Sequence, residues 1–414
     1  MANSTEKKKW TIMTYMAGDN NLDQNGAEDI KEMKQPGSTS GIHVIVQFDR
    51  AGAGQQTKRY YLKKGTSLND DAVQSVGETN TGSPDALIDF IRWGVTNYPA
   101  EHYLLVLWNH GQGWDDTDIY AGEQGAGARL TRSGRVRNAF FRTSVEQAAQ
   151  LSASDTAQAR AILLDDDAKD FLDNLEMKRV LQETQKMIGR KLDLLGMDAC
   201  LMNMAEVGYQ VKNSVLYTVG SEETEPLDGW PYDTILDSLS KQPNMSPIEL
   251  SKLIVKYYIN SYKGSGEAVT QSACDLSVSS TVASAVKKLA SALKTGLKNG
   301  TTRAMISDSR NRVQEYDVPA NIDLVDLCKL LKASKVPATI KNACNQVISV
   351  VQGNSGLVIS SGYCDKSMKR SNGVAIYFPT RSVSPLYTRL EFTKKTGWGT
   401  FLKAYINATR SRRG

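Results

Sequence analysis

Short apolar runs alternate with amphipathic stretches along the first half of the chain. The apolar runs predict strands at residues 10–17, 42–48, 103–109, 161–165 and 192–198, and helical spacing predicts helices near 22–34, 84–97, 174–188 and 201–212. Several of these runs have no alternating polar positions, which is typical of strands that are buried on both faces of a sheet. Strands separated by helices favour βαβ units, so we predict an α/β fold with a mostly parallel central sheet.

The pattern after about residue 235 is less regular. It predicts helices at 247–262, 277–297 and 325–333, and strands at 266–274, 355–360 and 373–378. We therefore predict two regions. The first, residues 1–240, holds the main sheet, and the second, residues 241–414, extends the sheet and adds a helical subdomain.

The stretch from about residue 112 to 160 has little strand or helix period. It is rich in Gly, Arg, Ser, Ala and Gln, and five arginines crowd into it: Arg129, Arg132, Arg135, Arg137 and Arg142. A long loop of this kind within a compact domain is either a solvated basic loop or a linker that proteases reach easily.

Composition excludes several classes of protein. The net charge of +5 is small and dispersed, so we expect no nucleic-acid binding, and no stretch approaches the ~20 apolar residues that cross a bilayer. The apolar stretch 10–17 is interpreted as a core strand, not a signal peptide, because Gly-Asp-Asn-Asn follows it. Five widely spaced cysteines without zinc spacing favour a reducing compartment. We expect a cytoplasmic location, with secretion as the alternative if a leader has been removed.

Two chemically active residues follow strand-like runs. His110 comes after the run 103–109, and Cys200 after the run 192–198. Parallel α/β sheets bear their chemistry at the carboxyl ends of strands, so the pair suggests a thiol nucleophile beside a proton carrier. His102 lies at the far end of its strand, and His43 opens one. The alternative interpretation is a buried structural cysteine and a histidine that only stabilises a turn.

The surroundings of the pair favour catalysis. Cys200 precedes a helix-forming run, and a helix amino terminus stabilises a thiolate. The backbone N–H groups of Gly111 and Cys200 are the predicted oxyanion hole.

Five motifs resemble the clostripain-like cysteine peptidases (peptidase family C11), a caspase-like family. They span Trp10–Leu22, Leu107–Trp114, Gly196–Glu206, Gly220–Tyr232 and Ser371–Pro379. The resemblance implies a caspase-like α/β/α sandwich over residues 1–240 with a smaller C-terminal α/β extension. It implies a catalytic dyad of His110 and Cys200, without a required third residue. It also implies protein or peptide substrates cut after Arg, or secondarily Lys.

A pocket for Arg needs a carboxylate, because the guanidinium fork is bound best by a bidentate acid. Two residues are equal candidates for this role. Asp198 lies two positions before the nucleophile on the same strand face, and Asp228 lies in the acidic segment expected to line the cleft.

The resemblance also implies a precursor that is cleaved between His110 and Cys200. An enzyme that cuts after Arg and carries an arginine cluster in this interval is able to cut itself. We therefore predict activation by cleavage after one of the five linker arginines, either by self-processing or by an upstream protease.

Two clusters of oxygen ligands follow strands, at Asp19-Asn20-Asn21 and at Asp165, Asp166 and Asp167. Such ligands suit Ca²⁺, on which some clostripain relatives depend, but caps and solvated loops explain each cluster equally well. We expect no required cofactor, with calcium as an option. Two other classes remain as alternatives: a catalytically idle caspase-like binding module, and a metal-dependent hydrolase that uses the Asp clusters.

Overall fold

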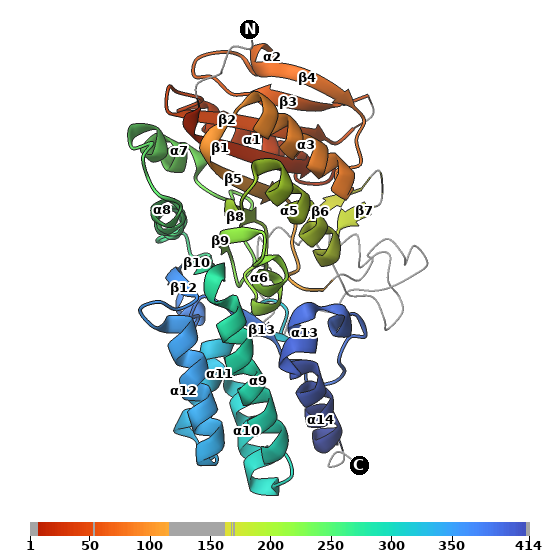
Figure 1. Cartoon of the computed structure of the whole chain (residues 1–414), viewed down its shortest axis with the longest axis vertical. Coiled ribbons are helices and arrows are strands. Elements are labelled where there is room, and N and C mark those ends of the chain that lie inside the picture. Colours follow the sequence, from red (N-terminus) through yellow and green to blue (C-terminus); the bar gives the residue numbers. More distant parts are fainter. Residues whose placement is uncertain (1–6, 53, 116–161, 167, 169, 411–414) are drawn as a thin grey trace.

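The computed structural model describes residues 7–52, 54–115, 162–166, 168 and 170–410. A nine-stranded sheet with the order β12-β10-β9-β8-β5-β1-β2-β3-β4 forms its centre (Figure 1). The five inner strands, from β9 to β2, run parallel, and antiparallel pairs add two strands at each edge. The predicted α/β fold with a mostly parallel central sheet is confirmed.

The strands of the sheet have the following bounds: β1 Lys8–Gly18, β2 Ile42–Arg50, β3 Thr57–Tyr61, β4 Ala72–Gly77, β5 Ala100–Trp108, β8 Leu192–Asp198, β9 Val215–Gly220, β10 Thr270–Asp275 and β12 Val358–Tyr363. Two short antiparallel pairs lie outside it, formed by β6 Ile162–Asp165 with β7 Asp170–Leu172, and by β11 Asn321–Asp323 with β13 Ala375–Tyr377.

The described α-helices are α1 Asp23–Lys34, α2 Leu68–Asp71, α3 Pro84–Asn97, α5 Asn174–Ile188, α6 Ala205–Val211, α7 Tyr232–Lys241, α8 Pro247–Ser261, α9 Ser279–Gly296, α10 Gly300–Arg312, α11 Leu324–Ala333, α12 Ala338–Gln352, α13 Glu391–Thr396 and α14 Trp398–Arg410. Short 3₁₀ turns are η2 Leu276–Val278, η3 Lys366–Met368 and η4 Leu386–Arg389. No helix in the described part of the chain is long and apolar enough to span a membrane.

Two sets of helices pack around the sheet. Helix α1 contacts α7, which contacts α8, while α3 contacts α5, which contacts α6. The strands between these sets are buried along their whole length, as in β8, because both sheet faces are covered. Local signals set the helix starts. In α3, for example, the Ser83 side chain caps a helix that opens with Pro84.

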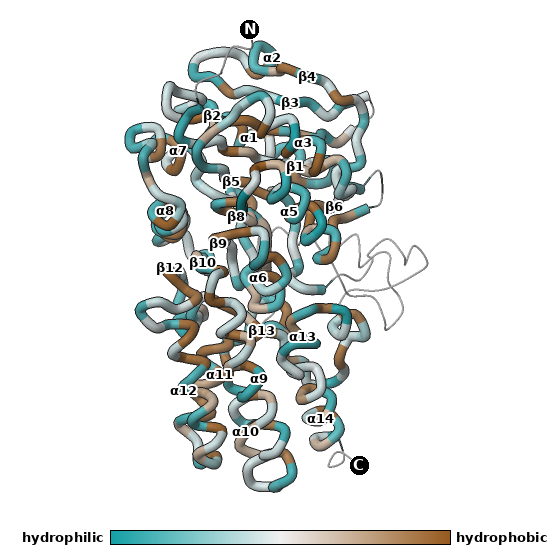
Figure 2. Tube along the Cα trace, in the orientation of Figure 1, coloured by the Kyte–Doolittle hydropathy of each residue, from teal (hydrophilic) through white to brown (hydrophobic). Residues whose placement is uncertain are grey.

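The second half of the chain contributes to the same sheet. Strands β10 and β12 lie beyond residue 241 and pair next to β9. The amphipathic helix α12 packs against both α9 and α11 below them, and Figure 2 shows the alternation of hydrophobic and hydrophilic positions along these helices. The domain boundary near residue 240 stays a prediction.

Two predicted strands do not join the sheet. The run 161–165 forms β6, where Leu163 has a φ of +62° and the register shifts, so its ladder with β7 is short. The run 373–378 forms β13, which pairs with β11 and is followed by Pro379. On the side away from β5, β8 pairs with β9, a run of six residues that the pattern analysis did not identify.

Candidate active site

The ends of β1, β5 and β8 lie at one edge of the sheet. Trp108 pairs with Met16 of β1 and with Asp198 of β8. His110 and Cys200 each lie two residues beyond this paired level, and the N–H of Asn109 donates to the carbonyl oxygen of Asp198 at 3.3 Å. The sheet therefore brings together the two loops that carry the predicted dyad.

Gly111 shows how closely these loops approach. A Cβ atom at this position would lie 2.5 Å from the carbonyl oxygen of Cys200 and 3.0 Å from the Cβ of Ala199. Real side chains do not tolerate such contacts, so only glycine allows the histidine loop to pass directly over the cysteine loop.

Asn21 orients the imidazole of His110. The Oδ1 atom of Asn21, in the loop after β1, lies 2.9 Å from Nε2 of the buried His110. An amide oxygen only accepts, so this contact places the ring proton on Nε2 and leaves Nδ1 as the basic atom of the neutral imidazole. The sequence analysis interpreted Asn21 as a calcium-ligand candidate and did not identify this role. The sequence feature that could have indicated this role is the position of Asn21 after the carboxyl end of β1, the strand next to β5.

The other two histidines are remote from the loops. His43 and His102 pair with Thr11 and Trp10 near the opposite ends of their strands. His102 contacts Asp193 through Nδ1 at 3.0 Å. Burial lowers the pKa of His43 to about 4, so this side chain is neutral at physiological pH.

The Cys200 thiol is fully buried. The backbone N–H of Glu225 donates to its Sγ at 3.2 Å, and the N–H of Leu201 donates to the carbonyl oxygen of Glu223 at 3.1 Å. We call residues 221–230 the cover segment, because it makes these contacts with the nucleophile loop. Leu201 has a φ of +63°, a strained value for a branched side chain that is often found at functional sites.

The predicted helix amino terminus at Cys200 is wrong. Helix α6 starts only at Ala205, because residues 200–204 form an irregular loop anchored by other contacts. Burial, and then the nearby carboxylates, raise the pKa of the Cys200 thiol well above its usual range, although the N–H of Glu225 opposes this. The thiol is therefore protonated while the cover segment lies against it.

The two predicted oxyanion-hole donors are available for binding. Within the described part of the chain, neither the Gly111 N–H nor the Cys200 N–H donates a hydrogen bond to a protein atom. Both belong to the loops that meet at Gly111, so a carbonyl oxygen placed between these loops is able to accept from them.

The two predicted cation-binding acids differ in their surroundings. Asp198 is buried and accepts from the Tyr232 hydroxyl at 2.6 Å, while Asp228 is exposed on the cover segment. Gly229 packs against the Asp198 carboxylate, since a Cβ there would lie 3.2 Å from both carboxylate oxygens. Burial raises the pKa of Asp198, and a hydrogen bond from Glu225 opposes this rise.

The C-terminal region holds the cover segment in place. Glu222 accepts from the Tyr316 hydroxyl at 2.7 Å and from the Gly373 N–H at 3.1 Å, and it shares a hydrogen bond with Asp323. Burial and the Asp323 charge raise the pKa of Glu222 well above its usual range, so this carboxyl group carries the shared proton.

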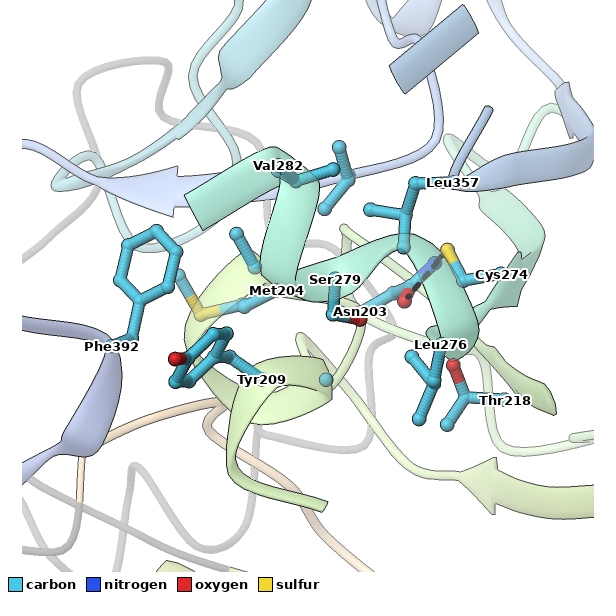
Figure 3. A pocket seen from close by; sticks show the side chains of 13 residues that line it. Asn203, Met204, Tyr209, Thr218, Cys274, Leu276, Ser279, Val282, Leu357 and Phe392 are labelled. Atoms are coloured by element: carbon cyan, nitrogen blue, oxygen red, sulfur yellow. Dashed lines mark hydrogen bonds between the residues drawn. The ribbon is translucent and has the colours of Figure 1, made fainter. Parts of the chain in front are cut away.

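Asn203 anchors the loop after Cys200 to the same region. Its side-chain amide donates to the Gly373 carbonyl oxygen at 3.0 Å and to Ser272. It also contacts Cys274, which lies beside it in Figure 3. The cavity in Figure 3 has a volume of only about 10 Å³ and has room for about one water molecule. It is not a peptide-binding site.

Three buried carboxylates gather beside the histidine loop. Asp19, Asp49 and Asp165 each offer an oxygen, and these atoms lie within 4.8 Å of one another. The fold thus joins one member of each predicted Asp cluster with Asp49, which the sequence analysis did not identify. Asp166 contributes its N–H to the carbonyl oxygen of Asp19 at 3.0 Å, and Asp167 lies outside the described residues.

The linker arginines Arg129, Arg132, Arg135, Arg137 and Arg142 also lie outside the described residues.

A histidine loop and a cysteine loop that meet at the carboxyl ends of parallel strands, beside a buried acid, are an arrangement typical of a cysteine peptidase. The sequence model of the clostripain family (peptidase C11) matches residues 14–125 and 148–405. The chain belongs to this family, and a metal-dependent hydrolase is not its class.

Individual relatives agree with this assignment. Clostripain of Hathewaya histolytica is 26% identical over 94% of this chain and 78% of its own length. Two solved structures share the fold at 19% identity and cover 94% of this chain. One is a secreted C11 protease of Bacteroides thetaiotaomicron bound to an irreversible peptide inhibitor (TM-score 0.64, 99% of that chain covered). The other is an inactive zymogen C11 protease of Parabacteroides distasonis (TM-score 0.61, 98% covered).

Proposed function

We propose that this cysteine peptidase is an endopeptidase that cleaves after Arg, and secondarily after Lys, with Cys200 as nucleophile and His110 as acid and base. The observation that carries the preference is the buried Asp198 carboxylate, two residues before the nucleophile. Among the described residues, no lysine or arginine forms an ion pair with it. A buried acid without a basic partner is costly unless a ligand supplies the positive charge.

The mechanism follows from the positions of the two loops. The proton of the Cys200 thiol passes to His110 as the sulfur attacks the scissile carbonyl carbon, and the N–H groups of Gly111 and Cys200 stabilise the oxyanion that forms. His110 then gives this proton to the leaving amine, which frees the new amino terminus and leaves an acyl-enzyme. His110 next takes a proton from the water that hydrolyses the thioester, and this proton returns to the sulfur when it leaves. Asn21 acts through His110 by fixing the orientation of its ring.

A panel of peptide amides that differ only in the residue before the scissile bond tests this function. We expect hydrolysis in the order Arg, then Lys, with little cleavage after Gln, Phe or Asp, because only the cations neutralise Asp198. Equal or faster cleavage after a neutral residue would contradict the proposed specificity.

The buried thiol supports synthesis as a zymogen. A peptide reaches Cys200 only after the groups around it move, and we propose that cleavage in the linker permits this movement. We expect the purified wild-type protein to become two chains, with a new end after Arg129, Arg132, Arg135, Arg137 or Arg142, while Cys200→Ala remains intact.

Mass spectrometry of both proteins over time locates the cut. If the wild type also stays intact and inactive, but gains activity when another protease cuts the linker, activation comes from an upstream protease. If cleavage leaves the activity unchanged, the linker is not inhibitory.

Calcium dependence remains a prediction. A calcium site requires a cluster of oxygen ligands, and Asp19, Asp49 and Asp165 form such a cluster. Were Ca²⁺ to bind there, removing it with EDTA would lower Tm, because saturation at 100 times Kd stabilises a fold by about 2.7 kcal/mol. Calorimetry with EDTA and with added Ca²⁺ measures this effect. An unchanged Tm and unchanged activity would contradict the predicted dependence on calcium.

The location in the cell also remains a prediction. The five cysteines are free thiols, which agrees with the expected reducing compartment. One similar structure is that of a secreted protease, which favours the alternative.

A further inference from the structure

Glu225 is the residue of the cover segment that contacts the nucleophile. Its backbone N–H donates to Cys200 Sγ at 3.2 Å, and its carbonyl oxygen lies 3.9 Å from the same sulfur. Movement of the cover segment away from the thiol therefore displaces the backbone of Glu225.

The side chain of Glu225 reaches the candidate cation pocket. It is fully buried, and its carboxyl group shares a hydrogen bond with that of Asp198. Gln271 donates to its Oε1 at 3.3 Å. The indole of Trp230 interacts with the Glu225 carboxyl group and the backbone N–H of Trp230 with that of Asp198, but neither Oε2 of Glu225 nor Oδ1 of Asp198 has a hydrogen bond of good geometry among the described residues. Two acids that share a hydrogen bond hold one proton between them, and here Glu225 carries it because the charge of Asp198 opposes ionisation of Glu225.

Other polar atoms around this pair also lack partners. The hydroxyl group of Tyr258 and the Oε1 atom of Gln271 are buried and have no hydrogen-bond partner among the described residues. Tyr258 lies close enough to Glu225, Asp198 and Cys200 to interact with them electrostatically. Protein interiors rarely leave several buried polar atoms unpaired at one place, unless a ligand completes them.

The ligand whose chemistry matches these unpaired groups is a guanidinium. It brings five N–H donors in a planar fork, a positive charge that no described lysine or arginine supplies to either acid, and the width to bridge two carboxyl groups. An ammonium is a point charge and cannot span both acids equally well.

We propose that Glu225 is the second carboxylate of the cation pocket, and that a guanidinium bound there draws Glu225 away from Cys200, so that one residue both recognises Arg and uncovers the thiol. This inference rests on the proposed preference for Arg. It adds that binding of the Arg side chain is coupled to exposure of the Cys200 thiol. Glu225 binds the substrate side chain and is a positioning residue for Cys200.

The proton balance of this step is simple. The guanidinium enters with its charge and replaces the proton that Glu225 shares with Asp198, and that proton leaves to solvent. The pocket then holds two carboxylates and one guanidinium, and no covalent bond changes. Binding of Arg therefore releases a proton and strengthens as pH rises through the pKa of Glu225.

The decisive variant is Glu225→Gln, which imitates the protonated side chain and so retains the hydrogen bond to Asp198. The matched control is Glu206→Gln. Glu206 is equally buried, but it accepts from the N–H of Tyr377 and the hydroxyl of Tyr387, away from the pocket. The probe is methylguanidinium, which carries the cation but offers no peptide bond for Cys200 to attack.

The rate of Cys200 alkylation by iodoacetamide, followed by mass spectrometry, reports how open the thiol is. We expect methylguanidinium to accelerate alkylation about fivefold or more in the wild type and in Glu206→Gln, within the usual range of coupling between sites, but not in Glu225→Gln. For an Arg substrate, Glu225→Gln should lower kcat/KM by about tenfold to a hundredfold and remove its rise with pH, as expected for the loss of one charged hydrogen-bond partner.

No acceleration in the wild type, or equal acceleration in Glu225→Gln, would overturn the inference. A thermal melt of each variant separates loss of folding from loss of coupling, and Glu225→Asp, which keeps the charge, should restore part of the acceleration. Failure of the proposed function looks different, because the wild type itself would then cleave no Arg or Lys substrate.

Discussion

Replacement of Cys200 by alanine is expected to lower kcat for an Arg peptide amide by about 10⁴-fold or more, because the attacking sulfur is removed while the oxyanion donors remain. The fold should survive, since the change removes one atom from a buried position. His110→Ala should cause a loss of similar order, because the leaving amine then departs without a proton. Measurements of kcat and KM on linker-cleaved protein, cut by an added protease where necessary, separate catalysis from activation.

Cys364→Ala is the matched control for the thiol. Cys364 lies beside β12, and its sulfur faces the Ile259 carbonyl oxygen at 3.3 Å, so its loss should leave kcat unchanged. If Cys200→Ala retained more than a few per cent of the wild-type kcat, the sulfur at position 200 would not be the nucleophile.

The pattern of apolar runs predicted the part of the fold that local sequence controls. The strands that became β1, β2, β5 and β8 are continuous apolar runs, and the helices that became α3 and α5 carry capping signals at Ser83 and Asp173. Because parallel strands present their carboxyl ends at one edge, the meeting of the two loops that carry His110 and Cys200 followed from the order of the elements.

The remainder depended on contacts between distant residues. Asn21 orients His110 across 89 positions of sequence, and Glu225 reaches Cys200 across 25. No local pattern distinguishes Asn21 from a loop asparagine, or Glu225 from the neighbouring Glu222 and Glu223. The carboxylate of Asp49 reaches Asp165 only after β6 folds beside β1.

The same reasoning explains why the state of the thiol was predicted wrongly. A helix directly after Cys200 would have lowered the pKa of the thiol, and the run from Leu201 has the composition of a helix. The chain instead uses residues 200–204 for contacts with the cover segment and the C-terminal region, through Leu201 and Asn203. Long-range hydrogen bonds thus override the local preference and leave the thiol buried and neutral.

Asp198→Asn should nearly abolish the preference for Arg. The substitution preserves the shape of the side chain and its contact with the Tyr232 hydroxyl, but it removes the buried charge that faces the guanidinium. Loss of a buried charged partner costs about 3–5 kcal/mol, so kcat/KM for Arg should fall by about 10²–10³-fold or more, while the small activity toward a neutral Gln substrate changes little.

Asp228→Asn is the control. Because water screens this exposed carboxylate, its loss should lower kcat/KM for Arg by about fivefold or less. The substrate panel described above, applied to both variants, gives the ratio of Arg to Gln cleavage. A larger loss of kcat/KM for Arg in Asp228→Asn than in Asp198→Asn would indicate that the exposed Asp228, and not the buried Asp198, binds the substrate cation.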